Sequence, residues 1–221
     1  MTANFRYEIF TAGSGGPDIY WGTLPDQRDV ERVFELVKKE NVGRPFRLIT
    51  YQPRDWNADF SPWRAPAVFD GKEFLGRADE TLRWLTEVCI PQVERDSQPT
   101  KRFLAGYSLA GLFSLWALTK SKLFDGAASC SGSLWFDGWT DYLIGTEWQP
   151  TNVVFLSLGR SEKNTKIAQM ATVSQATQTT YDHLRTRIAK VELEWNNGGH
   201  FSNTLERMAR GISWGVISYK L

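Results

Sequence analysis

Apolar and polar residues follow one another along this chain in blocks that predict strands and helices in turn. Short apolar runs of the kind that form strands occupy residues 5–12, 18–21, 46–51, 103–105, 126–130, 152–158 and 191–195. Apolar residues at helical spacing predict helices over about 26–43, 80–93 and 165–187, and from residues 109 and 203 onwards. Because strands and helices alternate from residue 18 on, the pattern predicts an α/β fold. We expect a single domain over residues 1–221, with a mostly parallel sheet and helices on both of its faces.

Two of these helices have a clear apolar face, with residues three and four positions apart. Asp26 is a suitable amino-terminal cap for the first helix. Its apolar face comprises Val30, Val33, Phe34 and Val37. The apolar face of the helix over 80–93 comprises Leu82, Leu85, Val88 and Cys89.

Two segments between the elements carry unusual composition. Residues 13–17 (GSGGP) lack the Gly-Lys-Ser/Thr sequence and the helix start of a phosphate-binding loop, so we expect a tight hairpin there. Residues 52–78 form a long irregular segment, and loops of that length inside a domain are usually functional or disordered. This one is rich in aromatic residues, which either pack the loop onto the body or form the wall of an active-site cleft: Trp56, Phe60, Trp63, Phe69 and Phe74.

Residues 106–111 (GYSLAG) lie where a strand breaks and a helix begins. Such a strand–turn–helix sequence with small residues around a serine is typical of a nucleophile elbow, in which the serine has a strained backbone. Gly106 stands two positions before Ser108, and Ala110 and Gly111 follow it. The sequence therefore favours Ser108 as a nucleophile; the alternative is a buried serine in an ordinary turn.

A serine hydroxyl needs an imidazole to accept its proton, and the chain has two histidines. His183 falls within a predicted helix and is expected to be an ordinary helix residue. His200 follows two glycines after the last strand, where a loop can bring the imidazole to the serine. We therefore expect His200 to be the general base, in preference to a structural or solvated role.

The imidazole in turn needs a carboxylate that holds its tautomer. Glu162 follows the strand over 152–158, and the chain order serine, acid, histidine is the order found in α/β-hydrolases. Glu162 is therefore the expected acid, although a surface glutamate would look the same in the sequence. Asp137 and Asp141 follow the preceding strand and are alternatives.

An oxyanion hole would complete this machinery. One expected donor is the backbone N–H of Leu109, directly after the nucleophile and at the positive end of its helix. The second is expected from the first strand-to-helix loop, residues 22–24, with the amide of Thr23 as the candidate.

Composition and charge exclude several other classes of protein. Basic and acidic residues number 26 and 25, which gives a net charge of +1 and no electrostatic basis for binding nucleic acid or an anionic membrane. We see no signal peptide and no apolar run long enough to cross a bilayer, so we expect a cytoplasmic protein. Cys89 and Cys130 have apolar surroundings and are expected to be buried free thiols. With two histidines and two scattered cysteines, no metal site is expected.

The motifs GYSLAG (106–111), LGRSEKN (158–164) and GGHF (198–201), together with DFSPW (59–63) and Ile90-Pro91, resemble the esterase D-like branch of the α/β-hydrolases. That branch includes enterochelin-type siderophore esterases, S-formylglutathione hydrolases and mycolyl transferases. The resemblance begins at about Asp18 and implies an α/β-hydrolase fold with Ser108 as nucleophile, His200 as base and Glu162 as acid. The chain is short, so we expect no large cap domain and no transfer of siderophore specificity.

The sequence thus predicts a serine esterase that acts on a small-molecule ester through an acyl-enzyme, with no metal or organic cofactor. The tryptophan-rich loops favour an apolar or aromatic ester. Acyl transfer to an alcohol or thiol would use the same acyl-enzyme and is the first alternative. Thioester or peptide hydrolysis, and a non-catalytic binding protein on a hydrolase scaffold, are the others.

Overall fold

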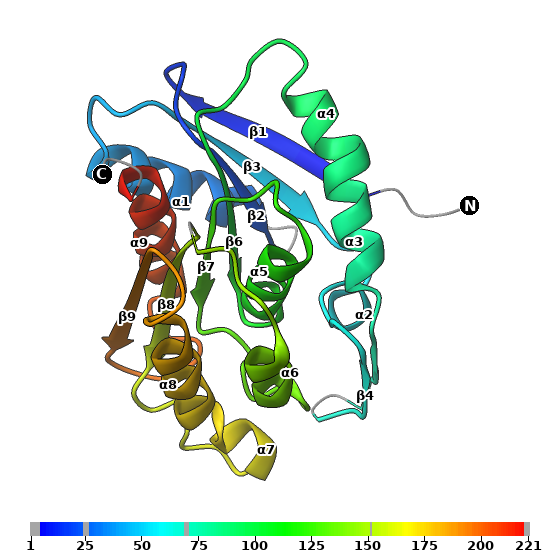
Figure 1. Cartoon of the computed structure of the whole chain (residues 1–221). Helices are drawn as coiled ribbons and strands as arrows, with labels where there is room; N and C mark the ends of the chain where they lie inside the picture. Colours follow the sequence, from blue (N-terminus) through cyan, green and yellow to red (C-terminus); the bar gives the residue numbers. More distant parts are fainter. Residues whose placement is uncertain (1–4, 24–26, 69–70, 151, 219–221) are drawn as a thin grey trace.

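The computed structural model describes residues 5–23, 27–68, 71–150 and 152–218, and these form a fold built on a seven-stranded sheet (Figure 1). In spatial order the strands are β1 (Arg6–Ala12), β3 (Phe46–Gln52), β2 (Asp18–Gly22), β6 (Arg102–Tyr107), β7 (Gly126–Cys130), β8 (Val153–Gly159) and β9 (Lys190–Asn196). Strand β1 is antiparallel to β3, and all other neighbours in this sheet are parallel. The predicted mostly parallel sheet is confirmed.

The predicted hairpin at residues 13–17 is wrong, because β3 lies between β1 and β2. All five residues of β2 are buried, so β2 is a central strand that needs partners on both edges, and β3 and β6 supply them. The turn instead packs against the start of β3. A Cβ on Gly16 would lie 1.8 Å from the carbonyl oxygen of Pro45, so only glycine permits this close approach.

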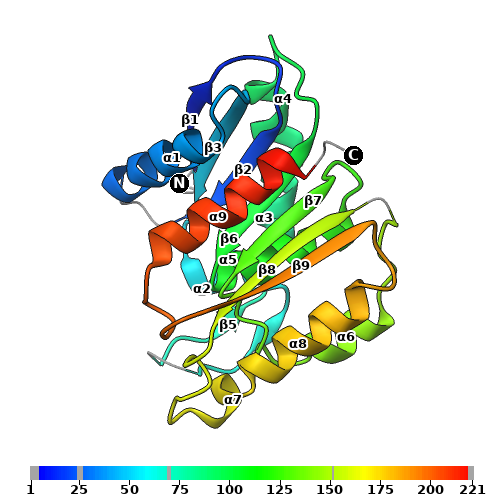
Figure 2. The ribbon, with the colours of Figure 1, turned by 90° about the vertical axis from the view of Figure 1, so that its left-hand side faces the viewer.

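Helices cover both faces of the sheet, as predicted (Figure 2). Each face has its own apolar core. On one face α1 (Gln27–Glu40) and α9 (Thr204–Ile217) pack together, and the predicted apolar face of α1 is buried there. The opposite face carries α3 (Ala78–Trp84), α5 (Leu109–Lys120), α6 (Trp139–Gly145) and α8 (Val173–Leu184). Asp26, the expected cap of α1, lies outside the described residues.

The predicted helix over 80–93 is continuous but irregular. It consists of α3, a π-helical turn η1 (Leu85–Cys89) and α4 (Ile90–Val93). The wider turn ends just before Pro91, which has no N–H to continue a regular ladder. Leu82, Leu85 and Cys89 are buried as predicted, but Val88 is 40% exposed because the wider turn changes the helical register. The predicted helix over 165–187 is divided into α7 (Ala168–Ala171) and α8.

The irregular segment over 52–78 holds a short helix, α2 (Trp56–Asp59), and the strand pair β4 (Arg64–Ala65) and β5 (Phe74–Leu75). Its aromatic residues divide between the two interpretations left open above. Phe60 and Phe74 are buried in the core, whereas Trp56 lines a surface cleft. Trp63 donates its indole N–H to the Asp137 carbonyl at 2.8 Å, and Phe69 lies outside the described residues.

Cys89 and Cys130 are both buried free thiols, as predicted, and burial raises the pKa of each to about 12. Within the described ranges, none of the helices has the length and apolar character that a bilayer crossing requires.

Candidate active site

Ser108 lies at the sharp turn between β6 and α5, with φ 57° and ψ −124°. Side chains rarely adopt this backbone conformation, so the surrounding structure must hold it. The Ser108 N–H donates to the Cys130 carbonyl at 3.1 Å, and the Ser108 carbonyl accepts from the amides of Gly111, Leu112 and Ser133. These bonds fix the serine at the carboxyl end of β6.

The small residues around Ser108 are required by close approach of the helix to the strand. A Cβ on Gly106 would lie 2.2 Å from the carbonyl carbon and oxygen of Ala110. A Cβ on Gly111 would lie 2.9 Å from Ser129 Oγ and 3.0 Å from the Gly106 carbonyl oxygen. The segment therefore has the strand–turn–helix geometry that the GYSLAG sequence predicts.

His200 and Glu162 lie next to each other although 38 residues separate them. Glu162 follows β8 and His200 follows β9, and these parallel strands end at the same edge of the sheet as β6. The distance between His200 Nδ1 and Glu162 Oε2 is 2.8 Å. Their side chains are 25% and 4% exposed, so the imidazole reaches solvent while the carboxylate is buried. His183, in contrast, lies in α8 as expected.

Glu162 is held by more than the histidine. Its Oε1 accepts hydrogen bonds from the Gly159 N–H at 2.7 Å and from Ser131 Oγ at 2.7 Å, and it forms an ion pair with Arg207 at 2.8 Å. Burial would raise the pKa of Glu162, but the hydrogen bonds from His200 and Arg207 outweigh it and lower the pKa to about 2. Glu162 is therefore an anion at neutral pH.

Arg207 is a component of the site that the sequence analysis missed. Its side chain is 1% exposed, and it donates to Ser131 Oγ and to the carbonyls of Gly199 at 3.1 Å and Ser202 at 3.3 Å. One guanidinium thus holds both the acid and the loop of the histidine. No local sequence motif marks Arg207, because its partners Glu162 and Ser131 belong to the loops after β8 and β7.

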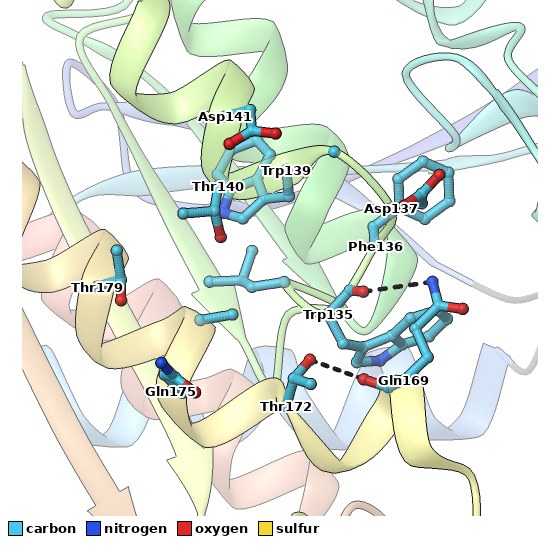
Figure 3. Close-up of a pocket in the computed structure, with 13 residues that line it drawn as sticks. Trp135, Phe136, Asp137, Trp139, Thr140, Asp141, Gln169, Thr172, Gln175 and Thr179 are labelled. Carbon is cyan, nitrogen blue, oxygen red and sulfur yellow. Dashed lines mark hydrogen bonds between the residues drawn. The ribbon is translucent and has the colours of Figure 1, made fainter.

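The alternative acids lie elsewhere. Asp137 and Asp141 line a separate pocket of about 320 Å3 between α6 and the region of α7 and α8 (Figure 3). There Gln169 donates to the Trp135 carbonyl and Thr172 to the Gln169 carbonyl. Glu162, and neither aspartate, is the carboxylate at His200 in the described structure.

The two expected oxyanion donors differ in availability. Leu109 is the first residue of α5, so its amide has no acceptor one turn earlier in the helix. The Thr23 N–H donates to the Tyr51 carbonyl at 3.0 Å, which continues the pairing of β2 with β3. Because one N–H cannot serve two acceptors well, the Thr23 amide does not offer a free donor in this conformation.

Ser108 and His200 open into one cleft of about 560 Å3. Most of its wall is apolar, and Asp29 is the one residue with a charged carboxylate among the described lining residues, which include no lysine or arginine. The lining comprises Trp21, Gly22, Thr23, Asp29, Trp56, Tyr107, Ser108, Ser133, Trp135, Thr165, Ile167, Met170, His200, Phe201, Thr204, Leu205 and Met208. No group of three or more histidine, cysteine or acidic side chains suited to a metal ion occurs among the residues placed by the structure.

No protein-family model matches this chain. One curated relative, the uncharacterized protein YbbA of Bacillus subtilis (strain 168), is 28% identical over 167 residues. That match covers 71% of this chain and 66% of YbbA, so it spans slightly less than two thirds of the relative.

Solved structures match over nearly the whole chain. The siderophore hydrolase EstA from Aspergillus nidulans has a TM-score of 0.73 and 19% identity, with 96% of this chain and 89% of EstA covered. An IroE-like serine hydrolase from Shewanella oneidensis has a TM-score of 0.76 and 16% identity over 95% of this chain and 75% of its own. The enterobactin esterase FES from Shigella flexneri has a TM-score of 0.66 and 15% identity over 96% of this chain and 55% of its own.

With its sheet order, its helices on both faces and these neighbours, the chain has the α/β-hydrolase fold, as the sequence predicts. The similar structures are named as a siderophore hydrolase, a serine hydrolase and an enterobactin esterase, and they represent the branch of the superfamily that the sequence motifs resemble.

Proposed function

We propose that this chain is a serine esterase that hydrolyses small-molecule carboxylic esters through an acyl-enzyme on Ser108. The observation that carries the proposal is the hydrogen-bonded pair of His200 and Glu162, which lies in the same cleft as a serine on a strained strand-to-helix turn. The names of the similar structures, serine hydrolase and esterase, support the same chemistry.

In this proposal each group has its own task. Since His200 Nδ1 faces Glu162, its Nε2 is the nitrogen that remains to accept the Ser108 proton. As that proton moves, Ser108 Oγ bonds to the ester carbonyl carbon and the carbonyl electron pair moves onto oxygen. The Leu109 N–H, at the positive end of α5, stabilises this oxyanion.

Collapse of the tetrahedral intermediate breaks the bond to the leaving alkoxide, which takes the proton from His200. Water then attacks the acyl-enzyme while His200 accepts one of its protons, and release of the acid restores the Ser108 hydroxyl. The reaction needs no metal or organic cofactor.

The cleft favours an uncharged, apolar ester. Trp21, Trp56 and Trp135 contribute to its wall, and Phe201, beside His200, is 89% exposed at its rim. An aromatic or alkyl group can bury apolar surface against these side chains, whereas the described lining residues offer no cation to an anionic substrate.

The first experiment is treatment with a fluorophosphonate followed by mass spectrometry of the intact and digested protein. We expect one adduct on Ser108 of the wild-type chain and none in the Ser108→Ala and His200→Ala variants. His183→Ala is the matched control, because it removes the other histidine, which lies in α8 away from the cleft lining.

Hydrolysis of a series of 4-nitrophenyl alkanoates should follow the same pattern, with a loss of at least about 10³-fold in both active-site variants. Folded wild-type protein that forms no adduct on Ser108 would exclude the mechanism. Adduct formation without release of acid, but with ester formation when an alcohol is added, would indicate acyl transfer.

A further inference from the structure

A second hydroxyl touches the proposed nucleophile. Ser133 Oγ lies 3.1 Å from Ser108 Oγ, and the Ser133 side chain is buried yet contributes to the lining of the cleft. Ser133 belongs to the loop that follows β7, and the sequence analysis gave it no role.

The backbone holds this contact in place. The Ser133 N–H donates to the Ser108 carbonyl at 3.0 Å, and the Ser108 N–H donates to the Cys130 carbonyl at 3.1 Å. Two backbone hydrogen bonds therefore tie the end of β7 and the loop that follows it to the elbow, so the backbones that carry the two hydroxyls are held close together.

In the proposed reaction Ser108 gives up its hydroxyl proton, whereas Ser133 keeps its own. When Ser108 gives its proton to His200, the Ser133 proton is the one that can point to the Ser108 oxygen. After Ser108 Oγ bonds to the substrate, the negative charge resides on the former carbonyl oxygen, bonded to the same carbon as Ser108 Oγ. Rotation about the Cβ–Oγ bond of Ser133 lets its hydrogen follow the charge to that oxygen.

Of the two oxyanion donors expected from the sequence, one is already engaged in the part of the chain that the structure describes. An oxyanion hole usually has two donors, and the Thr23 amide is already bonded to the Tyr51 carbonyl. Leu109, the first residue of α5, presents its amide at the elbow, and Ser133 Oγ is a side-chain donor 3.1 Å from Ser108 Oγ.

We propose that Ser133 is a catalytic residue whose hydroxyl donates to the oxyanion of the tetrahedral intermediate, together with the Leu109 amide. The proposal rests on the esterase function proposed above. Ser133 keeps its proton throughout, so the step adds a hydrogen bond and needs no further acid or base.

The test compares wild-type protein with Ser133→Ala and Ser133→Thr. Loss of one oxyanion donor typically lowers kcat about 10²–10³-fold. We expect that loss in Ser133→Ala with KM changed less than about threefold, and substantial recovery in Ser133→Thr, which keeps a hydroxyl. Ser157→Ala is the control, because Ser157 is a buried serine on β8 that does not line the cleft.

A trifluoromethyl ketone separates an oxyanion donor from a residue that only supports the fold. This compound forms a hemiketal oxyanion on the nucleophile, so its affinity for Ser133→Ala should fall in proportion to kcat/KM. Binding of the product acid should be unchanged. Thermal unfolding of each variant shows whether the fold is retained, and Ser133→Thr supplies the comparison if the alanine variant does not fold.

The outcomes distinguish the two proposals. If wild-type protein labels on Ser108 and hydrolyses esters, but Ser133→Ala keeps its kcat and ketone affinity, the role of Ser133 is excluded and the esterase function stands. If Ser133→Thr is as impaired as Ser133→Ala, the role is also excluded. If wild-type protein does not react at Ser108, the esterase function fails and the role of Ser133 fails with it.

Discussion

Arg207 joins two parts of the proposed catalytic apparatus that come from different elements. Its guanidinium bonds to Glu162, which follows β8, and to the carbonyls of Gly199 and Ser202 on either side of His200. Because this charge is 1% exposed, the cost of its desolvation has to be offset by such partners, which also include Ser131 Oγ. Arg207 therefore holds Glu162 and the backbone around His200 in place.

We expect Arg207→Met to destabilise the fold by about 3–5 kcal/mol, since it leaves the buried Glu162 carboxylate without its ion-pair partner. Urea unfolding would measure this loss. The control is Arg210→Met on the same helix, because the Arg210 ion pair with Glu194 involves side chains that are 40% and 33% exposed. Its cost should be about 1 kcal/mol or less, and equal losses in both variants would contradict the assignment.

The lowered pKa of Glu162 makes a second prediction, about acid stability. Its folded pKa of about 2 lies below the ordinary glutamate value of 4.5, so the unfolded state binds more protons between these pH values. Stability from this group is therefore complete above about pH 5 and is lost as the pH falls towards 2.

Urea unfolding of wild-type protein and Glu162→Gln over pH 2–7 would test it. The difference in unfolding free energy between them should be largest at neutral pH and should narrow as the pH falls towards 2. The control is Glu35→Gln, because the Glu35 side chain is 64% exposed and lies outside the site. A difference for Glu162→Gln that does not vary with pH would show that its carboxylate is not stabilised in the fold.

At the scale of elements, the turn from β6 to α5 depends on contact between backbones. We expect Gly106→Ala to abolish folding or activity, because its Cβ would lie 2.2 Å from the Ala110 carbonyl, which cannot move without shifting α5. Gly145→Ala is the matched control, since a Cβ there meets nothing within 4 Å. Yield of folded protein, thermal unfolding and fluorophosphonate labelling would compare them, and a labelled, stable Gly106→Ala would contradict the close-contact argument.

The elements show what an amino-acid pattern can and cannot predict. The apolar runs predict the strands well, because each strand in a covered sheet must bury its residues locally. Strand pairing depends on contacts between residues far apart in the sequence, which a local pattern does not contain. The glycine-rich turn at 13–17 therefore suggested a hairpin, whereas β2 is buried and β3 lies between β1 and β2. The π-helical turn before Pro91 could not be predicted either, because the apolar spacing was interpreted for a regular α-helix.

The residues of the candidate site also differ in whether a local sequence pattern can predict them. Ser108, Glu162 and His200 can be proposed from the sequence, because each follows a strand and the ends of parallel strands lie at one edge. Ser133 and Arg207 could not, since their roles depend on contacts across elements that no local motif encodes. Nor could the sequence show that the Thr23 N–H is bonded to the Tyr51 carbonyl, because this bond depends on the pairing of β2 with β3.

At the scale of the whole molecule, any selection of substrates by charge must come from the residues that line the cleft. The net charge of the chain is +1, so the protein as a whole exerts little long-range attraction on an ion of either sign. Within the described lining residues Asp29 supplies a carboxylate, and no lysine or arginine opposes it. An ester that carries a carboxylate therefore meets an apolar wall and a like charge.

We accordingly expect 4-nitrophenyl butyrate to have a higher kcat/KM than the 4-nitrophenyl monoester of succinic acid, which has similar length but ends in a carboxylate. Two like charges 4 Å apart in water repel by about 1 kcal/mol, so Asp29→Asn should improve the succinate ester by up to about fivefold and leave the butyrate ester unchanged. Added salt should reduce the difference between wild-type protein and the variant, because exposed charges are screened. If the anionic ester is the better substrate of wild-type protein, the cleft recognises anions, and the proposed neutral substrate class is wrong.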